Sequence, residues 1–258
     1  MHALAGKSLG LVSLFICCLS LKPDALNLAP PPGRMSSLPT RTLWVWERRE
    51  DLAGIDPRTT AIATLDRTIV LGRIVNAIPR RQPLVYPAGI KRLSVIRIEA
   101  PGEIALGMEG ATAALILDTA TADPTIAALQ IDFDAHRSQR SFYARLLRDI
   151  RRRLPPHLPL SITALASWCS SDDWLRGLPI DEAVPMFFRM EPDRRFAPPD
   201  LPQFRIRESL CTSSIGISTH EPYAGSLAGK RVYIFPDLGW RQDLPLITDN
   251  NPAQRIQP

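Results

Sequence analysis

The chain has 258 residues, of which 45% are hydrophobic and 22% are charged, and it contains 25 prolines. These values exclude a wholly disordered chain and a bundle of long helices, because the apolar content suffices for a core and frequent prolines interrupt long helices. The net charge of +5 does not indicate nucleic-acid binding, because the densest arginine run, residues 148–153, falls on the outer face of an expected amphipathic helix.

The N-terminal segment has the pattern of an export signal. Lys7 precedes an apolar run from Leu9 to Leu19, as in the n-region and h-region of a secretory signal. The run is shorter than the roughly 20 apolar residues of a membrane span, so a cleaved signal and an uncleaved anchor both remain open for residues 1–21. Residues 22–41 are rich in Pro, Leu, Ser and Ala and predict a linker. We expect an exported protein, periplasmic or anchored facing the periplasm, that meets the membrane only through this segment.

Strand and helix patterns alternate through residues 42–258, which we expect to be one domain. Eight short β-branched or aromatic runs between turn residues predict strands at 43–47, 61–71, 93–99, 126–134, 160–168, 183–190, 214–218 and 231–235. Helical spacing is clear at 138–154 and weaker at 109–120 and 172–178. The order strand–helix–strand predicts parallel strands. The fold class is therefore α/β, an irregular TIM-like (β/α)8 barrel, with an open α/β sheet as the alternative.

The run from Ile126 to Asp134 carries the main candidate site. Side chains alternate along a strand, which places Leu129, Ile131 and Phe133 on one face and Gln130, Asp132 and Asp134 on the other. The acids approach the C-terminal strand end, where barrels place active sites. Two carboxylates at short range raise one another's pKa and thereby prepare an acid and a base. The alternative is that these aspartates only cap a helix or pair with arginines.

Other strand ends supply further candidates. Glu99 and Glu221 are candidate acids, and Arg97 is expected to pair with Asp132 or to orient a substrate oxygen. The candidate substrate-binding residues are Trp46, Glu47, Arg97, Gln130, Trp168, Arg189 and Trp240. The tryptophans are proposed as sugar platforms, with buried core positions as the alternative. His220 is a weaker candidate for a general base.

Cysteine and glycine patterns limit the cofactors. Cys169 and Cys211 form either one disulfide or two separate buried thiols, and neither alternative is preferred. There is no Cys-x-x-Cys pair and no glycine-rich nucleotide fingerprint. We therefore expect no metal and no cofactor, and the oligomeric state stays open.

Four segments carry a resemblance to a known family. The segments 43–48, 129–135, 160–169 and 184–190 resemble a family of bacterial exported proteins known as a domain of unknown function. Strand 126–134 with the helix and strand that follow is distantly similar to the chitinase-like glycoside hydrolase barrels. Asp132 and Asp134 match two aspartates of the Asp-x-Asp-x-Glu motif of those barrels, and His136 stands in place of the glutamate.

These observations lead to three hypotheses. The first is a glycoside-hydrolase-like enzyme acting on an envelope or extracellular polysaccharide, in which Glu99 or Glu221 protonates the leaving oxygen and the aspartates hold the reacting centre. The second is a non-catalytic glycan-binding or envelope-assembly barrel, suggested by His136. The third is an internal ion-pair network of Asp132, Asp134 and nearby arginines that binds nothing.

Overall fold

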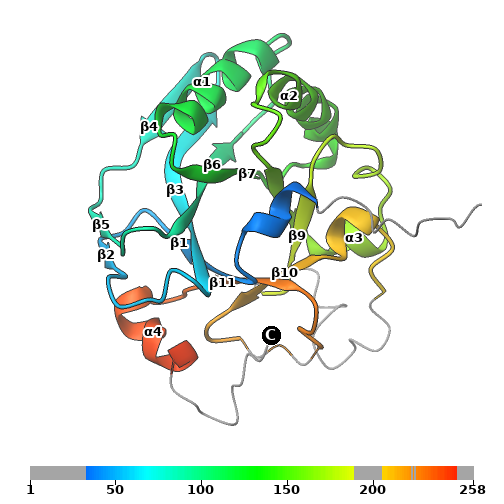
Figure 1. Cartoon of the computed structure of the whole chain (residues 1–258). Coiled ribbons are helices and arrows are strands. Elements are labelled where there is room, and N and C mark those ends of the chain that lie inside the picture. The colour runs from blue at the N-terminus through cyan, green and yellow to red at the C-terminus, as the bar shows by residue number, and fades with distance from the viewer. Residues whose placement is uncertain (1–32, 189–204, 222, 224, 249–258) are drawn as a thin grey trace, which may run out of the picture. The chain divides into compact units, whose positions relative to one another are not determined.

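Eight parallel strands close into a barrel in the computed structural model, which describes residues 33–188, 205–221, 223 and 225–248. The barrel closes because β1 pairs with both β3 and β11 (Figure 1). Its strands in ring order are β1 (Arg41–Val45), β3 (Thr60–Leu71), β6 (Lys91–Glu99), β7 (Ile126–Asp132), β8 (Leu160–Leu165), β9 (Glu182–Met186), β10 (Ser214–Ser218) and β11 (Arg231–Phe235). Each coincides with a predicted strand, so the predicted TIM-like single-domain barrel is confirmed.

The helices lie outside the strands and bury their apolar faces against them. α1 (Glu109–Ala122) and α2 (Arg140–Arg153) lie side by side over β6 and β7 (Figure 1). Phe142, Leu146 and Ile150 of α2 are fully or almost fully buried, at the helical spacing that the sequence predicted. Shorter helices are η1 (Arg34–Ser37), η2 (Arg137–Gln139), α3 (Ala166–Ser170), η5 (Ser209–Cys211) and α4 (Trp240–Thr248).

Several crossovers depart from the ideal pattern of one full-length helix after each strand, among them those after β3 and β8. The predicted helix at 172–178 is wrong, because this stretch forms hydrogen-bonded turns and Gly177 adopts a positive φ of 73°. The predicted strand 160–168 ends at Leu165, and its last residues form α3. Between β3 and β6 the chain makes β4 (Val75–Pro79), which pairs antiparallel with the far end of β3, and β5 (Leu84–Val85), which pairs with β2 (Glu50–Asp51). The β3–β4 hairpin therefore takes the place of a crossover helix.

The barrel interior is polar at its centre. Gln130 is fully buried, where its Oε1 accepts from Trp44 Nε1 (2.9 Å) and its Nε2 donates to Ser161 Oγ (3.1 Å). Glu182, also fully buried, accepts from Arg231 (2.9 Å) and from the Tyr233 hydroxyl. Gln130 and Glu182 thus have partners inside the barrel, as a low-dielectric interior favours.

The N-terminal end of the barrel is covered by η1, which lies within the sequence expected to be a linker. Met35 and Leu38 are buried against the interior side chains, and the Met35 carbonyl accepts from Arg231 (2.5 Å). This covered end leaves the opposite, C-terminal end as the one where a ligand site is expected.

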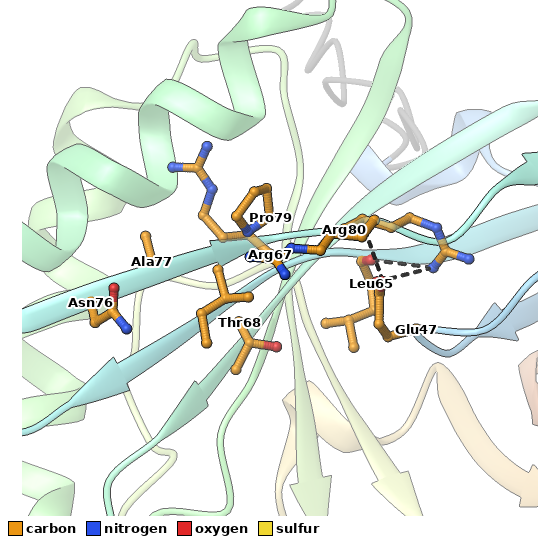
Figure 2. A pocket seen from close by; sticks show the side chains of 10 residues that line it. Glu47, Leu65, Arg67, Thr68, Asn76, Ala77, Pro79 and Arg80 are labelled. Atoms are coloured by element: carbon orange, nitrogen blue, oxygen red, sulfur yellow. Dashed lines mark hydrogen bonds and ion pairs between the residues drawn. The ribbon is translucent and has the colours of Figure 1, made fainter.

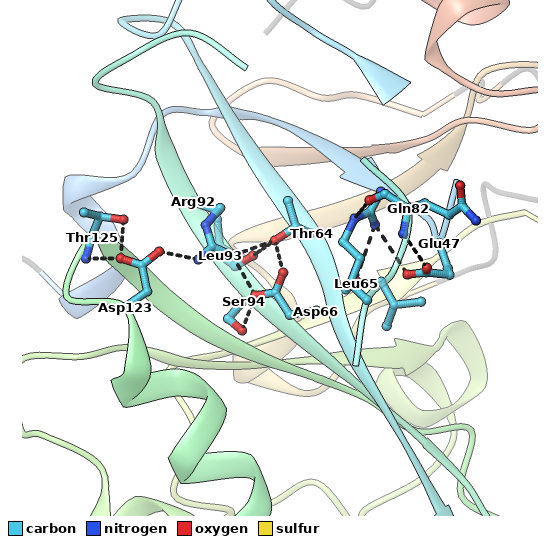
Figure 3. Close-up of polar contacts among 11 residues, drawn as sticks. Glu47, Thr64, Leu65, Asp66, Gln82, Arg92, Leu93, Ser94, Asp123 and Thr125 are labelled. Carbon is cyan, nitrogen blue, oxygen red and sulfur yellow. Dashed lines mark hydrogen bonds and ion pairs between the residues drawn. The ribbon is translucent and has the colours of Figure 1, made fainter. Parts of the chain in front are cut away.

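A second polar network ties β3, β6 and β7 together beside the hairpin. Asp66 stands at a bulge in β3, where its carboxylate accepts from Thr64 (2.7 Å), Ser94 (2.6 Å) and Arg92 (2.6 Å), as Figure 3 shows. Arg92 also donates to Asp123 (2.7 Å), which precedes β7. The network holds the base of the β3–β4 hairpin to its neighbouring strands.

Cys169 and Cys211 form a disulfide, which decides between the two alternatives left by the sequence. It joins α3 to η5, segments separated by 42 residues. Within the described residues, no helix is both long and apolar enough to cross a membrane.

Candidate functional site

The candidate site lies where β6 and β7 end at the C-terminal end of the barrel. The predicted alternation along β7 is confirmed, because Leu129, Ile131 and Phe133 pack in the core between strands and helices. Gln130 and Asp132 turn to the opposite face, into the barrel. Asp134 follows two residues after Asp132 and is exposed.

Asp132 is buried and fixed by two donors. Its Oδ1 accepts from Thr163 Oγ1 (2.7 Å) and its Oδ2 from Arg97 (2.8 Å). Arg97 also reaches Glu99, with 3.2 Å between its Nε and the carboxylate. The expected Arg97–Asp132 pair is thus present. We name Arg97, Glu99, Asp132 and Asp134 the acid cluster.

Asp134 has a different environment from Asp132. It keeps contact with solvent, yet surrounding protein atoms desolvate its carboxylate, and this desolvation, together with the charge of Asp132, raises its pKa. Arg97 and His136 oppose this rise without cancelling it. Asp134 therefore keeps a proton to higher pH than an ordinary aspartate does.

Tyr143 of α2 lies beneath the acid cluster and was not predicted from the sequence. It is fully buried, and burial followed by the charges of Asp132 and Asp134 raises its pKa well above the usual value. Its hydroxyl has no hydrogen-bond partner among the described residues. In the sequence it is one more apolar-face position of the helix, so no pattern distinguishes it.

Two side chains hold the loops around the acid cluster. Gln139 accepts from the His136 N–H (2.9 Å) and donates to the carbonyls of Ala100 (3.2 Å) and Gly102 (3.3 Å), which joins the loops after β6 and β7. Figure 3 also shows Glu47, whose carboxylate accepts the backbone N–H groups of Arg81 (2.8 Å) and Gln82 (2.9 Å). Glu47 thus holds the segment after β4.

Of the three predicted sugar platforms, Trp46 alone is accessible. It is half-buried against Trp44 (ring centroids 4.3 Å apart) and Phe235, and its Nε1 donates to the Pro236 carbonyl (3.2 Å). Trp168 is 2% exposed and Trp240 is fully buried. A buried ring has no free face for a ligand, so the stacking role is not available to Trp168 or Trp240.

The remaining predicted residues are not brought to the acid cluster. The side-chain amide of Gln130 is hydrogen-bonded to Trp44 and Ser161 inside the barrel, so Gln130 is a core residue rather than a substrate ligand. Glu221 follows β10, three strands along the barrel from β7, and is exposed. Arg189 lies outside the described residues. His220, near Glu221, holds Asp243 through its Nε2 (3.0 Å).

A pocket of about 490 Å³ lies beside the β3–β4 hairpin, and Thr68, which lines it, is the register partner of Arg97. Figure 2 shows Glu47, Leu65, Thr68 and Asn76 among the side chains that line it. Thr68 and Asn76 were not predicted as site residues. Thr68 lies within a predicted strand, but no strand was predicted between residues 71 and 93, where β4 places Asn76. The antiparallel pairing that places Asn76 beside β3 is long-range information.

Within the described residues, no three His, Cys, Asp or Glu side chains are grouped as metal ligands would be. The acid cluster contains one guanidinium among its carboxylates, an arrangement suited to proton transfer and to hydrogen bonding of hydroxyl groups. The fold and site together define a TIM-like α/β barrel with an acidic C-terminal end.

Comparison with known families adds one finding. Residues 93–185 match the family model described as "Domain of unknown function (DUF3142)". The matched residues run from β6 to β9 and include all four residues of the acid cluster. No curated protein and no solved structure is similar enough to this chain to count as a match.

Proposed function

We propose that this chain is a glycoside-hydrolase-like enzyme that cleaves an envelope or extracellular polysaccharide at the acid cluster. One observation carries the proposal: Asp132 and Asp134 lie two residues apart but in different environments. Asp132 is fixed by Arg97 and Thr163, whereas Asp134 is exposed and has a raised pKa. Carboxyl groups separated in this way are typical of an acid and its charged companion.

In the proposed reaction, protonated Asp134 donates its proton to the glycosidic oxygen while the bond from that oxygen to the anomeric carbon breaks. The Glu99 carboxylate, whose side chain is 50% exposed, accepts a proton from the water whose oxygen adds to that carbon. One water is consumed for each bond cleaved. Arg97, held by Asp132, orients Glu99 and the sugar. The raised pKa of Asp134 supports its role as the acid.

Two further observations support the substrate and the location. Trp46, half-exposed at the same end of the barrel, offers an aromatic surface to sugar C–H groups. The Cys169–Cys211 disulfide fits an oxidising compartment, which agrees with the export that the N-terminal segment predicts.

The test is Asp134→Asn assayed for release of reducing ends from a panel of neutral and acidic polysaccharides. We expect a loss of roughly 100-fold or more, the usual contribution of a general acid. The matched control is Asp173→Asn, because the Asp173 side chain is 84% exposed and pairs only with Arg176 at the surface. Equal activity in wild type and Asp134→Asn would remove the proposed acid, and no release from any polysaccharide would remove the enzyme.

A second candidate, glycan binding without cleavage, is favoured by His136. This residue stands where the chitinase-like barrels have a glutamate, and it is exposed. The binding function predicts that wild type and Asp134→Asn bind the same glycans in calorimetry while neither releases reducing ends. Turnover by the wild type would exclude it.

A further inference from the structure

We propose that the pocket beside the β3–β4 hairpin is a subsite for one uncharged sugar unit, adjacent to the bond cleaved at the acid cluster. This inference rests on the proposed function and adds to it where a second unit of the polysaccharide binds. We call this pocket the hairpin subsite. Its lining includes Leu65, Thr68, Asn76 and Ile78 together with the charged residues Glu47, Arg67, Arg80 and Arg81.

The hairpin subsite and the acid cluster lie on the same face of neighbouring strands. Thr68 of β3 is the register partner of Arg97 of β6, and Arg97 is the partner of Asp132 of β7. Partners in parallel strands point to the same side of a sheet. Arg97 donates to Asp132, on the barrel-facing side. A ligand in contact with Thr68 is therefore one strand away from the side chain that fixes Asp132.

The hairpin lengthens this face beyond the barrel rim. β3 has 12 residues, more than any other strand in the described part of the chain. Its last part pairs with β4 on one side and with β6 on the other. Thr68 pairs with Ile78, so both side chains point to the same side, and Figure 2 shows Arg67 turned the opposite way. The hairpin thus forms a wall beside the acid cluster.

The lining combines apolar surface with polar groups that have no partner among the described residues. Ile78 is 41% exposed and Leu65 adds an apolar floor. No described residue bonds to the Thr68 hydroxyl or to the Asn76 amide. A sugar ring presents C–H groups on its faces and hydroxyls on its edge, which match both kinds of surface. The volume of about 490 Å³ falls in the usual range of small-molecule sites.

Two of the three arginines that line the hairpin subsite have their guanidinium groups directed to backbone carbonyls. Arg80 donates to the carbonyls of Trp46 (2.8 Å), Arg48 (2.5 Å) and Gln82 (3.0 Å). Arg67 reaches toward α1, where it donates to the Leu115 carbonyl (3.4 Å).

An anionic unit would also lie next to a carboxylate. Glu47 lines the subsite with its side chain 39% exposed, and Arg81 is the neighbouring exposed cation. These opposite charges offset one another at the rim. Apart from the Arg81 guanidinium beside Glu47 at the rim, the uncommitted side-chain hydrogen-bonding groups of the subsite are the neutral ones, Thr68 and Asn76.

The experiment uses the full chain and calorimetric binding to β-1,4-linked oligomers of glucose, N-acetylglucosamine and mannose, two to six units long, with galacturonic acid oligomers as the anionic comparison. The variant is Thr68→Val with Asn76→Ala, which removes both hydrogen-bonding groups and keeps a β-branched residue in β3. We expect roughly tenfold weaker binding of the neutral oligomers, because two hydrogen bonds are lost. Dimers are included, since a dimer that spans the cleaved bond already places one unit in the adjacent subsite.

Two controls separate the outcomes. Asn76→Ala alone changes an exposed residue of β4 and covers the case in which the double variant fails to fold. Ile74→Ala lies at the tip of the same hairpin, is 75% exposed and does not line the pocket, so its binding should equal that of wild type.

The subsite is refuted, with the proposed function intact, if Asp134→Asn abolishes hydrolysis while the hairpin variants bind every oligomer like wild type. Preference for galacturonic acid oligomers that depends on Asn76 would overturn the uncharged class. If wild type neither binds nor cleaves any oligomer, the proposed function and the subsite both fail.

Discussion

Replacing Asp132 with alanine tests whether this carboxylate stabilises the fold, in contrast to Asp134, which is proposed to take part in the reaction. The change removes the acceptor of Arg97 at 2.8 Å and of Thr163 at 2.7 Å. Breaking a buried ion pair by removing one partner costs about 3–5 kcal/mol. The Arg97 side chain is 32% exposed and retains Glu99, so solvent reduces the cost to about 2–3 kcal/mol.

The matching experiment is thermal unfolding at pH 7 followed by circular dichroism. For a domain of this size, 2–3 kcal/mol lowers Tm by about 5–10 °C. Asp134→Ala should keep or raise Tm. It removes a desolvated carboxylate that is repelled by the charge of Asp132, the two effects that raise the pKa of Asp134. Asp118→Ala, at a side chain 75% exposed and 3.8 Å from Arg67, controls for loss of a surface charge.

Two results would refute this reasoning. A Tm for Asp132→Ala within a degree of the Asp118→Ala control would show that the Arg97 contact contributes nothing to stability. Equal losses for Asp132→Ala and Asp134→Ala would show that the two aspartates do not differ in the way the proposed function requires.

Three further predictions concern other parts of the chain. Cys169→Ser with Cys211→Ala should lower the free energy of unfolding by about 3–4 kcal/mol in guanidinium titration, since the bridge spans 42 residues; an unchanged midpoint would contradict it. Glu182→Ala should cost about 3–5 kcal/mol or prevent folding, because the buried Arg231 loses its carboxylate, and Glu182→Gln should be milder in the same titration. Asp134→Asn should gain stability relative to wild type as pH rises above 3.8. Because the pKa of Asp134 is raised in the folded state, the stability that this group contributes is present at low pH and is lost as pH rises from 3.8 through the folded pKa. A constant difference across the pH series would show that the pKa of Asp134 is not raised.

The strand pattern was predictable because each barrel strand is a short local run of apolar residues. The β7 run also predicted which side chains face inward, since alternation needs no knowledge of the neighbouring strands. The same local rule fails for tryptophans. Trp46 and Trp168 both lie near the ends of predicted strands. Trp168 falls in α3 and is buried against Trp174, whereas Trp46 follows β1 and is half-buried. Burial of a single ring depends on contacts that are distant in the sequence.

The partners of the site residues were predictable only in part. Arg97 and Asp132 were expected to pair because both lie near the C-terminal ends of strands that a regular barrel places side by side. Thr163 and Tyr143 carried no such signal, since a threonine in a strand and a tyrosine on a helix's apolar face have ordinary structural roles. Their relevance comes from the acids beside them.

The irregular crossover after β3 accounts for both the weakest part of the sequence prediction and the proposed subsite. In a regular barrel a helix would follow β3 and return the chain along the outside. Here Pro79, Pro83 and Pro87 disfavour a helix, and the chain turns back as β4 against an extended β3. A hairpin that continues the sheet keeps its side chains in register with β6, which a helix could not do. The face that holds Arg97 and Asp132 is thereby extended past the rim, and a ligand bound at the acids meets Thr68 and Asn76 on a continuous surface.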